Sequence, residues 1–297
     1  MSENFVNIGE ILQSLRAYKG IDIKDLAEDV CSVDELILIE KNMQDPTIDQ
    51  LFKFANKLNV QLSDFFDFAS AGSVNYVSAV SELINKYKRE RNYNAINDVV
   101  QREKENPLFN FPSGKQFLVW HEAICLFYLS ESAKREKVYS IKMLYEAIEI
   151  TNPSRKGLTE REIEIKMSIA LIEKDELSYE KSITILKEII EDIDKLPALA
   201  DPKVRLRALF GLSQSLSNIK NYEESLIYSQ LGIKQCINDE VLYLLGEFLH
   251  QTGINFAYLG NVSTGKEYLI KSLHIFDLQK NEGLANIVRR DLEVLSN

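Results

Sequence analysis

Two segments near the end of the chain, LFGLSQSLSNIKNYEESLIYSQLGIK (209–234) and LHQTGINFAYLGNVSTGKEYLIKSLH (249–274), can be laid over each other without a gap. The offset between them is 40 residues, measured from Ser213 to Gly253. Small residues coincide at Ser213 and Gly253, at Ser225 and Gly265, and at Gly232 and Ser272. Because small side chains at fixed places let two helices approach closely, this repetition predicts stacked helical hairpins.

The same spacing recurs through most of the chain and predicts five helix pairs followed by a last helix. The pairs are expected at residues 74–105, 114–150, 158–194, 201–236 and 241–277. The last helix, GLANIVRRDLEVLS (283–296), is expected to cap the array. The pattern resembles the tetratricopeptide repeat, although its period is longer than the usual ~34 residues. That resemblance implies a right-handed superhelix whose first helices line a concave face, which commonly holds an extended peptide.

The composition indicates a helical protein with no sign of secretion or membrane insertion. Six prolines in 297 residues and the lack of strand-like alternation predict an all-α fold. The start, MSENFVNIGE, is unlike a signal peptide, and no apolar run approaches the ~18 residues of a membrane span. We therefore expect a cytoplasmic protein with no membrane partner.

Motifs for catalysis, metals or cofactors are not found in the sequence. The three cysteines and three histidines are widely spaced, which favours neither a disulfide framework nor a metal site. A phosphate-binding loop and a Ser-His-Asp arrangement are also missing. We expect no enzyme, no cofactor and no metal. Since the net charge is −10, any contact with nucleic acid must come from a local patch.

Residues 1–68 carry the pattern of a small domain of short helices. Apolar residues recur at helical spacing from Ile8 onward, and Gly20 ends that helix. Asp22 and Ser32 are suitable N-caps for the next two helices. The register resembles the lambda-repressor-like, Xre-type helix-turn-helix domain. The residues that carry this resemblance include Gly20-Ile21, Leu26-Ala27, Ile39-Glu40, Pro46-Thr47, Leu51 and Ala55.

The segment in the position of the DNA-reading helix, SVDELILIEKN (32–42), has an unusual composition for that role. It has no Arg and no Gln, its one Asn comes last, and its first turn carries Asp34 and Glu35. Residues 1–66 contain six basic and twelve acidic side chains, a net charge of about −6. Phosphate contacts supply much of the affinity for DNA, and base-edge hydrogen bonds supply the specificity. Both are sparse in this sequence.

Two interpretations of this domain remain open. In the first, it still reads DNA, because carboxylates can accept from cytosine and aliphatic side chains can pack on thymine methyls. The candidate base contacts are Ser32, Asp34, Glu35, Ile37 and Leu38, and the candidate phosphate contacts are Lys24, Lys41 and Lys53. In the second, the domain is a protein-binding adaptor that no longer reads DNA. Many family members have Thr-Gln and Ser-Arg where this chain has Asp22-Ile23 and Ile37-Leu38.

A domain of this type, joined by a linker at 69–76 to a repeat domain at 77–297, resembles one known group of proteins. This is the Rap, Rgg, NprR, PrgX and PlcR group of peptide-sensing regulators of Gram-positive bacteria, and the five repeats are most similar to PlcR-type members. The motifs that carry the resemblance are QFLVW (116–120), KRERNY (88–93) and NYEESLIY (221–228). The resemblance implies a homodimeric transcription regulator, usually an activator, that binds double-stranded DNA and a short re-imported signalling peptide.

The candidate peptide site lies mainly on the first helix of each pair. The resemblance implies that two basic residues before the tyrosine of the first repeat hold the peptide carboxylate, and the matching positions are Arg89 and Arg91. A guanidinium group can pair with a carboxylate through two hydrogen bonds. The other candidates share the inward stripe of these helices: Asn85, Lys88, Leu171, Lys174, Phe210, Gln214, Asn218, His250, Ile254 and Tyr258. A small-molecule ligand in the same groove is the alternative.

Overall fold

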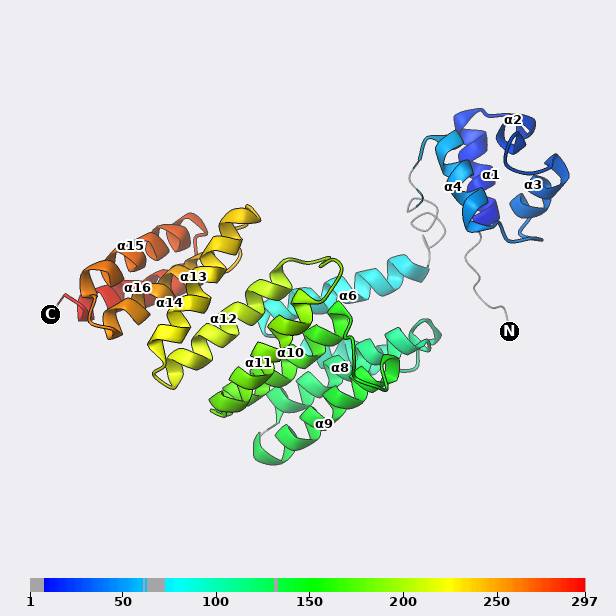
Figure 1. The fold of residues 1–297 in the computed structure, drawn as a ribbon. Helices are drawn as coiled ribbons and strands as arrows, with labels where there is room; N and C mark the ends of the chain where they lie inside the picture. Colours follow the sequence, from blue (N-terminus) through cyan, green and yellow to red (C-terminus); the bar gives the residue numbers. More distant parts are fainter. Residues whose placement is uncertain (1–7, 61, 63–72, 131–132, 297) are drawn as a thin grey trace. The chain divides into compact units, whose positions relative to one another are not determined.

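The protein divides into two compact units, Met1–Arg91 and Asn92–Asn297. The computed structural model describes residues 8–60, 62, 73–130 and 133–296. Within these ranges every regular element is a helix, which confirms the expected all-α fold (Figure 1). Residues 69–72 of the predicted linker (69–76) lie outside the described part. Helix α6 (Ser73–Glu90) begins inside the predicted linker and belongs to the first unit.

The first unit begins with four short helices, which we call the head. They are α1 (Ile8–Lys19), α2 (Ile23–Ala27), α3 (Val33–Glu40) and α4 (Ile48–Leu58). The predicted caps are confirmed, since Asp22 accepts from the Lys24 amide at 2.8 Å and Ser32 from the Glu35 amide at 3.1 Å. A side-chain oxygen at this place satisfies a backbone N–H that the helix itself leaves unpaired.

The core of the head gathers one apolar face from each of these helices. Its fully buried members are Leu12, Leu26, Leu36, Ile39, Phe54 and Leu58. Helices α1 and α3 approach closely at Gly9, where a Cβ atom would lie 1.8 Å from the carbonyl oxygen of Ile39. The Gly9 amide also donates to Asn42 Oδ1 at 2.9 Å, so α3 is fixed against the start of α1.

A buried ion pair joins the end of α1 to the end of α3. Arg16 Nε lies 2.6 Å from Glu40 Oε1, and Arg16 Nη2 donates to Glu40 Oε2 at 2.9 Å. The Glu40 side chain is only 3% exposed. Arg16 Nη1 also donates to the Ile21 carbonyl at 3.3 Å. Two parallel hydrogen bonds hold a carboxylate more firmly and with more directional control than one.

The second unit, which we call the repeat unit, is a stack of helix pairs (Figure 1). It begins with α7 (Tyr93–Glu103) and a 3₁₀ turn at Pro107–Phe109. The pairs are α8 (Pro112–Leu129) with α9 (Ala133–Thr151), α10 (Glu160–Asp175) with α11 (Tyr179–Asp194), α12 (Lys203–Asn218) with α13 (Tyr222–Asn238), and α14 (Leu245–Tyr258) with α15 (Val262–Leu278). The last helix, α16 (Glu282–Val294), packs on α15 and caps the stack. These bounds agree with the second to fifth predicted pairs, 114–150, 158–194, 201–236 and 241–277, to within a few residues.

Small residues do bring the two helices of a pair together, as the repeat predicted. Ser213 and Ser225 exchange hydrogen bonds with each other's carbonyl groups, at 3.2 and 2.7 Å. One repeat later, a Cβ atom on Gly253 would lie 2.8 Å from the Gly265 carbonyl oxygen. In the preceding pair Ser182 Oγ donates to the Ala170 carbonyl at 2.8 Å.

Buried hydrogen bonds also join one pair to the next. We call this set the polar seam. It consists of Ser182 with Ser215 at 3.3 Å, Asn255 with Ser225 at 2.8 Å, and Thr252 with Ser229 at 2.9 Å. All six side chains are buried. Because each donor has an acceptor, the seam fixes how successive pairs are rotated without leaving unpaired polar groups in the core.

The motif QFLVW (116–120) is structural in this protein. Gln116 Nε2 donates to the Ala147 carbonyl at 3.1 Å and to Thr151 Oγ1, so it joins α8 to α9. Trp120 Nε1 donates to Ser168 Oγ at 2.8 Å on α10. Both side chains are buried, and the motif therefore fixes the position of α8 against α9 and α10.

Candidate functional site

The exposed face of α3 holds most of the candidate DNA contacts. Ser32, Asp34, Leu38 and Lys41 are exposed, and Glu35 and Ile37 are half-buried. Positions 34, 37, 38 and 41 share one helical face, because they are separated by three, four and seven residues. The other side of the helix is anchored by Leu36 and Ile39, which are fully buried.

The side chain of Glu35 is held by two amide groups from outside α3. Glu35 Oε1 accepts from Gln44 Nε2 at 3.1 Å and from Gln50 Nε2 at 2.9 Å. Gln50 Oε1 in turn accepts from the Thr47 amide at 2.8 Å, within the capping box of α4. Sequence analysis did not identify Gln44 and Gln50 as part of this surface. The Thr47-x-x-Gln50 spacing would have predicted the capping box, but no sequence signal predicts the Gln44 contact.

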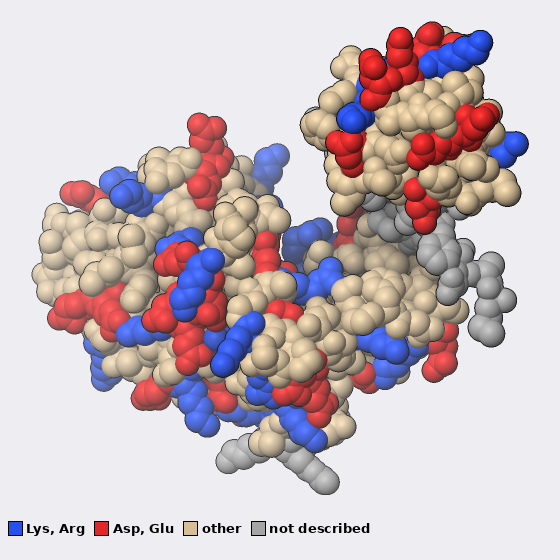
Figure 2. All heavy atoms as spheres, turned by 45° about the vertical axis from the view of Figure 1, so that its right-hand side comes forward, with Lys and Arg blue, Asp and Glu red and all other residues tan. Residues whose placement is uncertain are grey.

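Few cations in the head are available for phosphate. Arg16 is paired with Glu40, and Lys57 Nζ donates to the carbonyls of Asp25 and Glu28 at the end of α2. Lys53, a candidate phosphate contact, lies 2.7 Å from Asp49. Within the described head, Lys19, Lys24 and Lys41 are the cations that have no such bond. Figure 2 shows acidic side chains among the basic ones on the visible face of the head.

In the repeat unit, the structure brings two candidate peptide contacts together. Lys174 Nζ donates to Gln214 Oε1 at 3.0 Å, which joins the first helices of two successive pairs. Asn218 lies one turn further along α12 and donates to the Gln214 carbonyl at 2.9 Å. Leu171 lies one turn before Lys174 on α10 and is half-buried. Hydrogen bonds therefore link Lys174, Gln214 and Asn218.

The remaining candidates of this unit are each engaged by a neighbouring side chain. Phe210 contacts Phe248 edge-on, with ring centroids 5.4 Å apart. Tyr258 is 66% exposed and stacks on Tyr222 at 4.7 Å. Ile254 packs against the core cluster of α15 and α16. His250 Nε2 lies 2.6 Å from Asp291 Oδ2 on α16, a contact that the sequence did not predict.

Asn85, Lys88, Arg89 and Arg91 belong to the first unit, so their part in one site with the repeat-unit residues remains a prediction. Asn85, Arg89 and Arg91 are exposed, and Lys88 is half-buried. Arg91 has a positive φ of 53°, as do Lys220 (63°) and Lys280 (54°) before other helices that begin with an Asn cap. The sequence did not predict this backbone role of Arg91.

Glu247 is a half-buried carboxylate in the first turn of α14. Its Oε2 atom is buried, and no hydrogen bond to it is found in the described part of the chain. Burial raises the pKa of Glu247, while its own backbone amide and His250 act in the opposite direction. The ionised form of this carboxyl group is therefore less favourable in the folded protein than in water.

Replacing Glu247 by Gln should stabilise the protein at pH 7 by about 1 kcal/mol, because a buried charge is removed while the shape is kept. Because the pKa of Glu247 is raised in the folded protein, its carboxyl group contributes to folding stability at low pH. This contribution is lost as the pH rises through the folded-state pKa. The gain from Glu247→Gln should therefore shrink towards pH 4. Thermal unfolding of both proteins across this range measures it, and a gain that is equal at both ends would contradict the assignment.

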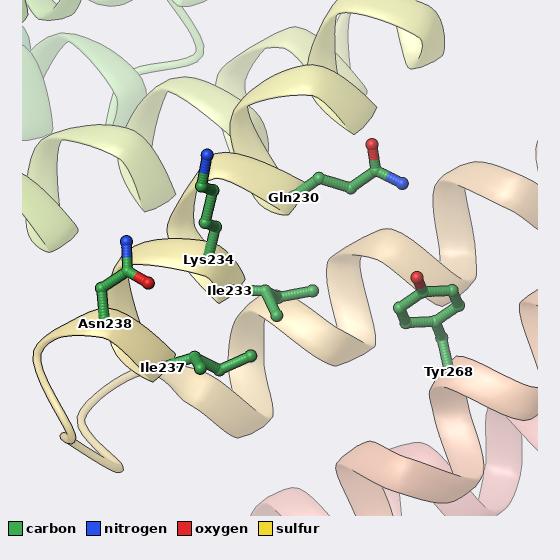
Figure 3. A pocket seen from close by; sticks show the side chains of 6 residues that line it. All are labelled: Gln230, Ile233, Lys234, Ile237, Asn238 and Tyr268. Carbon is green, nitrogen blue, oxygen red and sulfur yellow. The ribbon is translucent and has the colours of Figure 1, made fainter.

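A surface pocket of the repeat unit is lined by none of the candidate peptide residues. It has a volume of about 280 Å³ and lies between α13 and α15. Figure 3 shows Gln230, Ile233, Lys234, Ile237 and Asn238 on α13, with Tyr268 opposite on α15. In the described ranges, no group of three His, Cys, Asp or Glu side chains is placed to hold a metal ion.

Comparison with known proteins gives one family match, which covers more than two thirds of the chain. The model of the RNPP family C-terminal domain matches residues 81–293. The chain belongs to the RNPP family. The matched range includes the basic segment at 88–91 and every candidate peptide contact in the repeat unit. No curated protein matches the chain.

Solved structures similar to this RNPP chain cover both of its units. PlcR from Bacillus thuringiensis, in complex with the peptide PapR7 and DNA, has a TM-score of 0.80 and 20% identity, covering 96% of this chain and 99% of PlcR. ComR from S. thermophilus, in complex with DNA and its signalling peptide ComS, has a TM-score of 0.65 and 15% identity, covering 98% and 100%. The pheromone receptor Rgg2 from Streptococcus dysgalactiae has a TM-score of 0.61 and 17% identity, covering 96% and 98%.

These likenesses confirm the predicted architecture. PlcR and ComR were solved in complex with a peptide and DNA, and Rgg2 is a pheromone receptor. At identities of 20% and below, they show the fold and do not transfer individual contacts. In the described part of the chain, no helix is both long and apolar enough to cross a membrane.

Proposed function

We propose that this RNPP protein is a peptide-responsive transcription regulator of the cytoplasm that acts as an activator, and the DNA beside its own gene is the first target to test. The observation that carries the proposal is the joining of a capped helix-turn-helix head to the family's repeat domain in one chain. The similar PlcR and ComR structures contain both DNA and a signalling peptide, and this supports the same two partners here.

In this proposal the head binds double-stranded DNA through α3. Ser32, Asp34, Ile37 and Leu38 are proposed to face base edges, and Lys24, Lys41 and Lys53 to face phosphate. Each phosphate contact adds about −0.9 to the slope of log K against log salt. With so few free lysines, the slope should be shallow. A gel-shift titration at several salt concentrations measures it.

The alternative is a protein-binding adaptor, which the acidic balance of the head favours. The two functions differ in one measurement. A regulator shifts a duplex from beside its own gene and is competed away poorly by unrelated DNA. An adaptor gives no sequence-dependent shift at any salt concentration, with or without the peptide.

The regulator is proposed to act as a homodimer. Helix-turn-helix proteins read two half-sites separated by about 34 Å or a multiple of it, which requires two heads in one assembly. Light scattering of the full chain at micromolar concentration should give about twice the 34.1 kDa of one chain. A mass of one chain, both with and without peptide, would contradict the dimer.

The signalling peptide is proposed to bind the first helices of the repeats, with its carboxylate at Arg89 and Arg91. A charge-assisted pair of this kind contributes about 1.5–3 kcal/mol, so Arg89→Ala should weaken peptide binding roughly tenfold or more. Amidation of the peptide should cost a similar factor. Arg102 is an exposed arginine outside the candidate set, and Arg102→Ala is the matched control. Isothermal titration with the peptide encoded beside the gene tests this, and an unchanged affinity after amidation would rule out the anchor.

A further inference from the structure

The helix proposed to read DNA, α3, contains no Asn or Gln, so it has no side-chain amide of its own. The fold places two side-chain amides beside it from outside the helix. Gln44 lies in the loop after α3, and Gln50 lies in the first turn of α4. Both Nε2 atoms bond the same oxygen of Glu35, at 3.1 and 2.9 Å. Since Glu35 is in the first turn of α3, both amide groups lie at the end of the helix that enters the groove in this class of domain.

The two glutamines differ in how much of their hydrogen-bonding capacity remains. Gln50 is half-buried, and its Oε1 accepts from both the amide and the hydroxyl of Thr47, at 2.8 and 3.1 Å. Gln44 is exposed, and its bond to Glu35 is the one side-chain hydrogen bond that it makes to described residues. Gln50 is therefore committed to the start of α4, while Gln44 can also contact a ligand.

Glu35 decides which way the Gln44 amide group points. An ionised carboxylate only accepts hydrogen bonds, so it takes the NH₂ side of an amide and not the carbonyl side. With one N–H of Gln44 bound to Glu35, the second N–H and the Oε1 atom remain available. An amide with one free donor and one free acceptor matches adenine, which presents N7 as acceptor and N6 as donor in the major groove.

We propose that Gln44 is a specificity-determining residue that contacts adenine in the major groove, and that Glu35 is the positioning residue that orients it. This rests on the proposed DNA binding. It gives Glu35 a different part from the direct cytosine contact that the sequence suggested. It also accounts for a reading surface with few cations, because a neutral amide adds specificity without requiring a positive charge.

The test is a selection from random duplexes with the full-length chain, followed by affinity measurements on the enriched sequence and its single-base variants. Wild-type protein should enrich an adenine at one position of each half-site. Gln44→Ala should lose that preference by about 5- to 150-fold and keep the preferences at other positions. Gln13 is exposed on α1, away from the Glu35 contacts, and Gln13→Ala, the same chemical change, should alter no preference.

Glu35→Gln separates positioning from direct contact. An amide at position 35 can either donate or accept, so it no longer fixes the orientation of Gln44. The adenine preference should weaken in this variant, and no preference for cytosine should be lost. The proposal is overturned if Gln44→Ala keeps every preference of the wild type, or if Glu35→Gln instead loses a cytosine. If wild-type protein enriches no sequence at all, the proposed function itself fails.

Discussion

Replacing Arg16 by Met should destabilise the head by about 3–5 kcal/mol, because it leaves the Glu40 carboxylate buried without its partner. The methionine keeps the aliphatic stem, so most of the effect comes from the lost charge. Glu40 is 3% exposed and cannot turn to water without disturbing the end of α3. Hydrogen exchange of the amides in α1 and α3, measured in the full chain, reports the loss directly.

Two further variants identify the cause of this effect. Arg16→Met combined with Glu40→Leu removes both charges and should recover most of the lost stability, since no buried charge remains. Lys53→Met removes the exposed pair with Asp49, which is 2.7 Å long, and should cost about 0.5 kcal/mol or less. An Arg16→Met effect no larger than that of Lys53→Met would show that burial does not strengthen the pair.

Replacing Gly232 by Ala should destabilise the repeat unit by about 3 kcal/mol, although alanine is intrinsically the better helix former by about 1 kcal/mol. A Cβ atom there would lie 2.2 to 2.5 Å from three ring atoms of Phe248. Phe248 is fully buried and also contacts Phe210, so its ring has little room to move. Urea unfolding followed by the fluorescence of Trp120, the single tryptophan, measures the change.

The glycine control for this variant is in α16. A Cβ atom on Gly283 would meet its first neighbour, Asn281 Oδ1, only at 3.7 Å. Gly283→Ala should therefore be neutral or stabilise by up to about 1 kcal/mol. Adding Phe248→Leu to Gly232→Ala removes the crowded ring and should restore part of the stability that Gly232→Ala lost. If Gly232→Ala has the same effect as Gly283→Ala, then α13 does not approach α14 closely at Gly232 and Phe248.

The helix pairs could be predicted from sequence because their signal is local and repeated. Ser213 and Ser225 are twelve residues apart, Gly253 and Gly265 repeat this spacing, and each pair of small residues forms one contact. Capping follows similar short-range rules, so Asp22 and Ser32 were identified correctly. In both cases the partners lie within one hairpin or one turn of each other.

The candidate site was predicted less completely, because its contacts join residues that no spacing relates. Gln44 reaches back nine residues over a loop to Glu35, and His250 pairs with Asp291 forty-one residues later. Counting charges also could not distinguish a free cation from one such as Lys57, which is bound to backbone carbonyls. The positive φ of Arg91 is a backbone property that the residue type conceals.

The polar seam makes the stack from α10 to α15 resistant to twisting. Apolar surfaces can slide over each other with little penalty, but a hydrogen bond such as Asn255 to Ser225 holds only over a narrow range of angles. One such bond between α11 and α12 and two between α13 and α14 resist twisting between neighbouring pairs. Helices α10 to α15 should therefore move as one rigid body. A ligand that displaces α10 should rotate α15 with it and should not bend the stack between them.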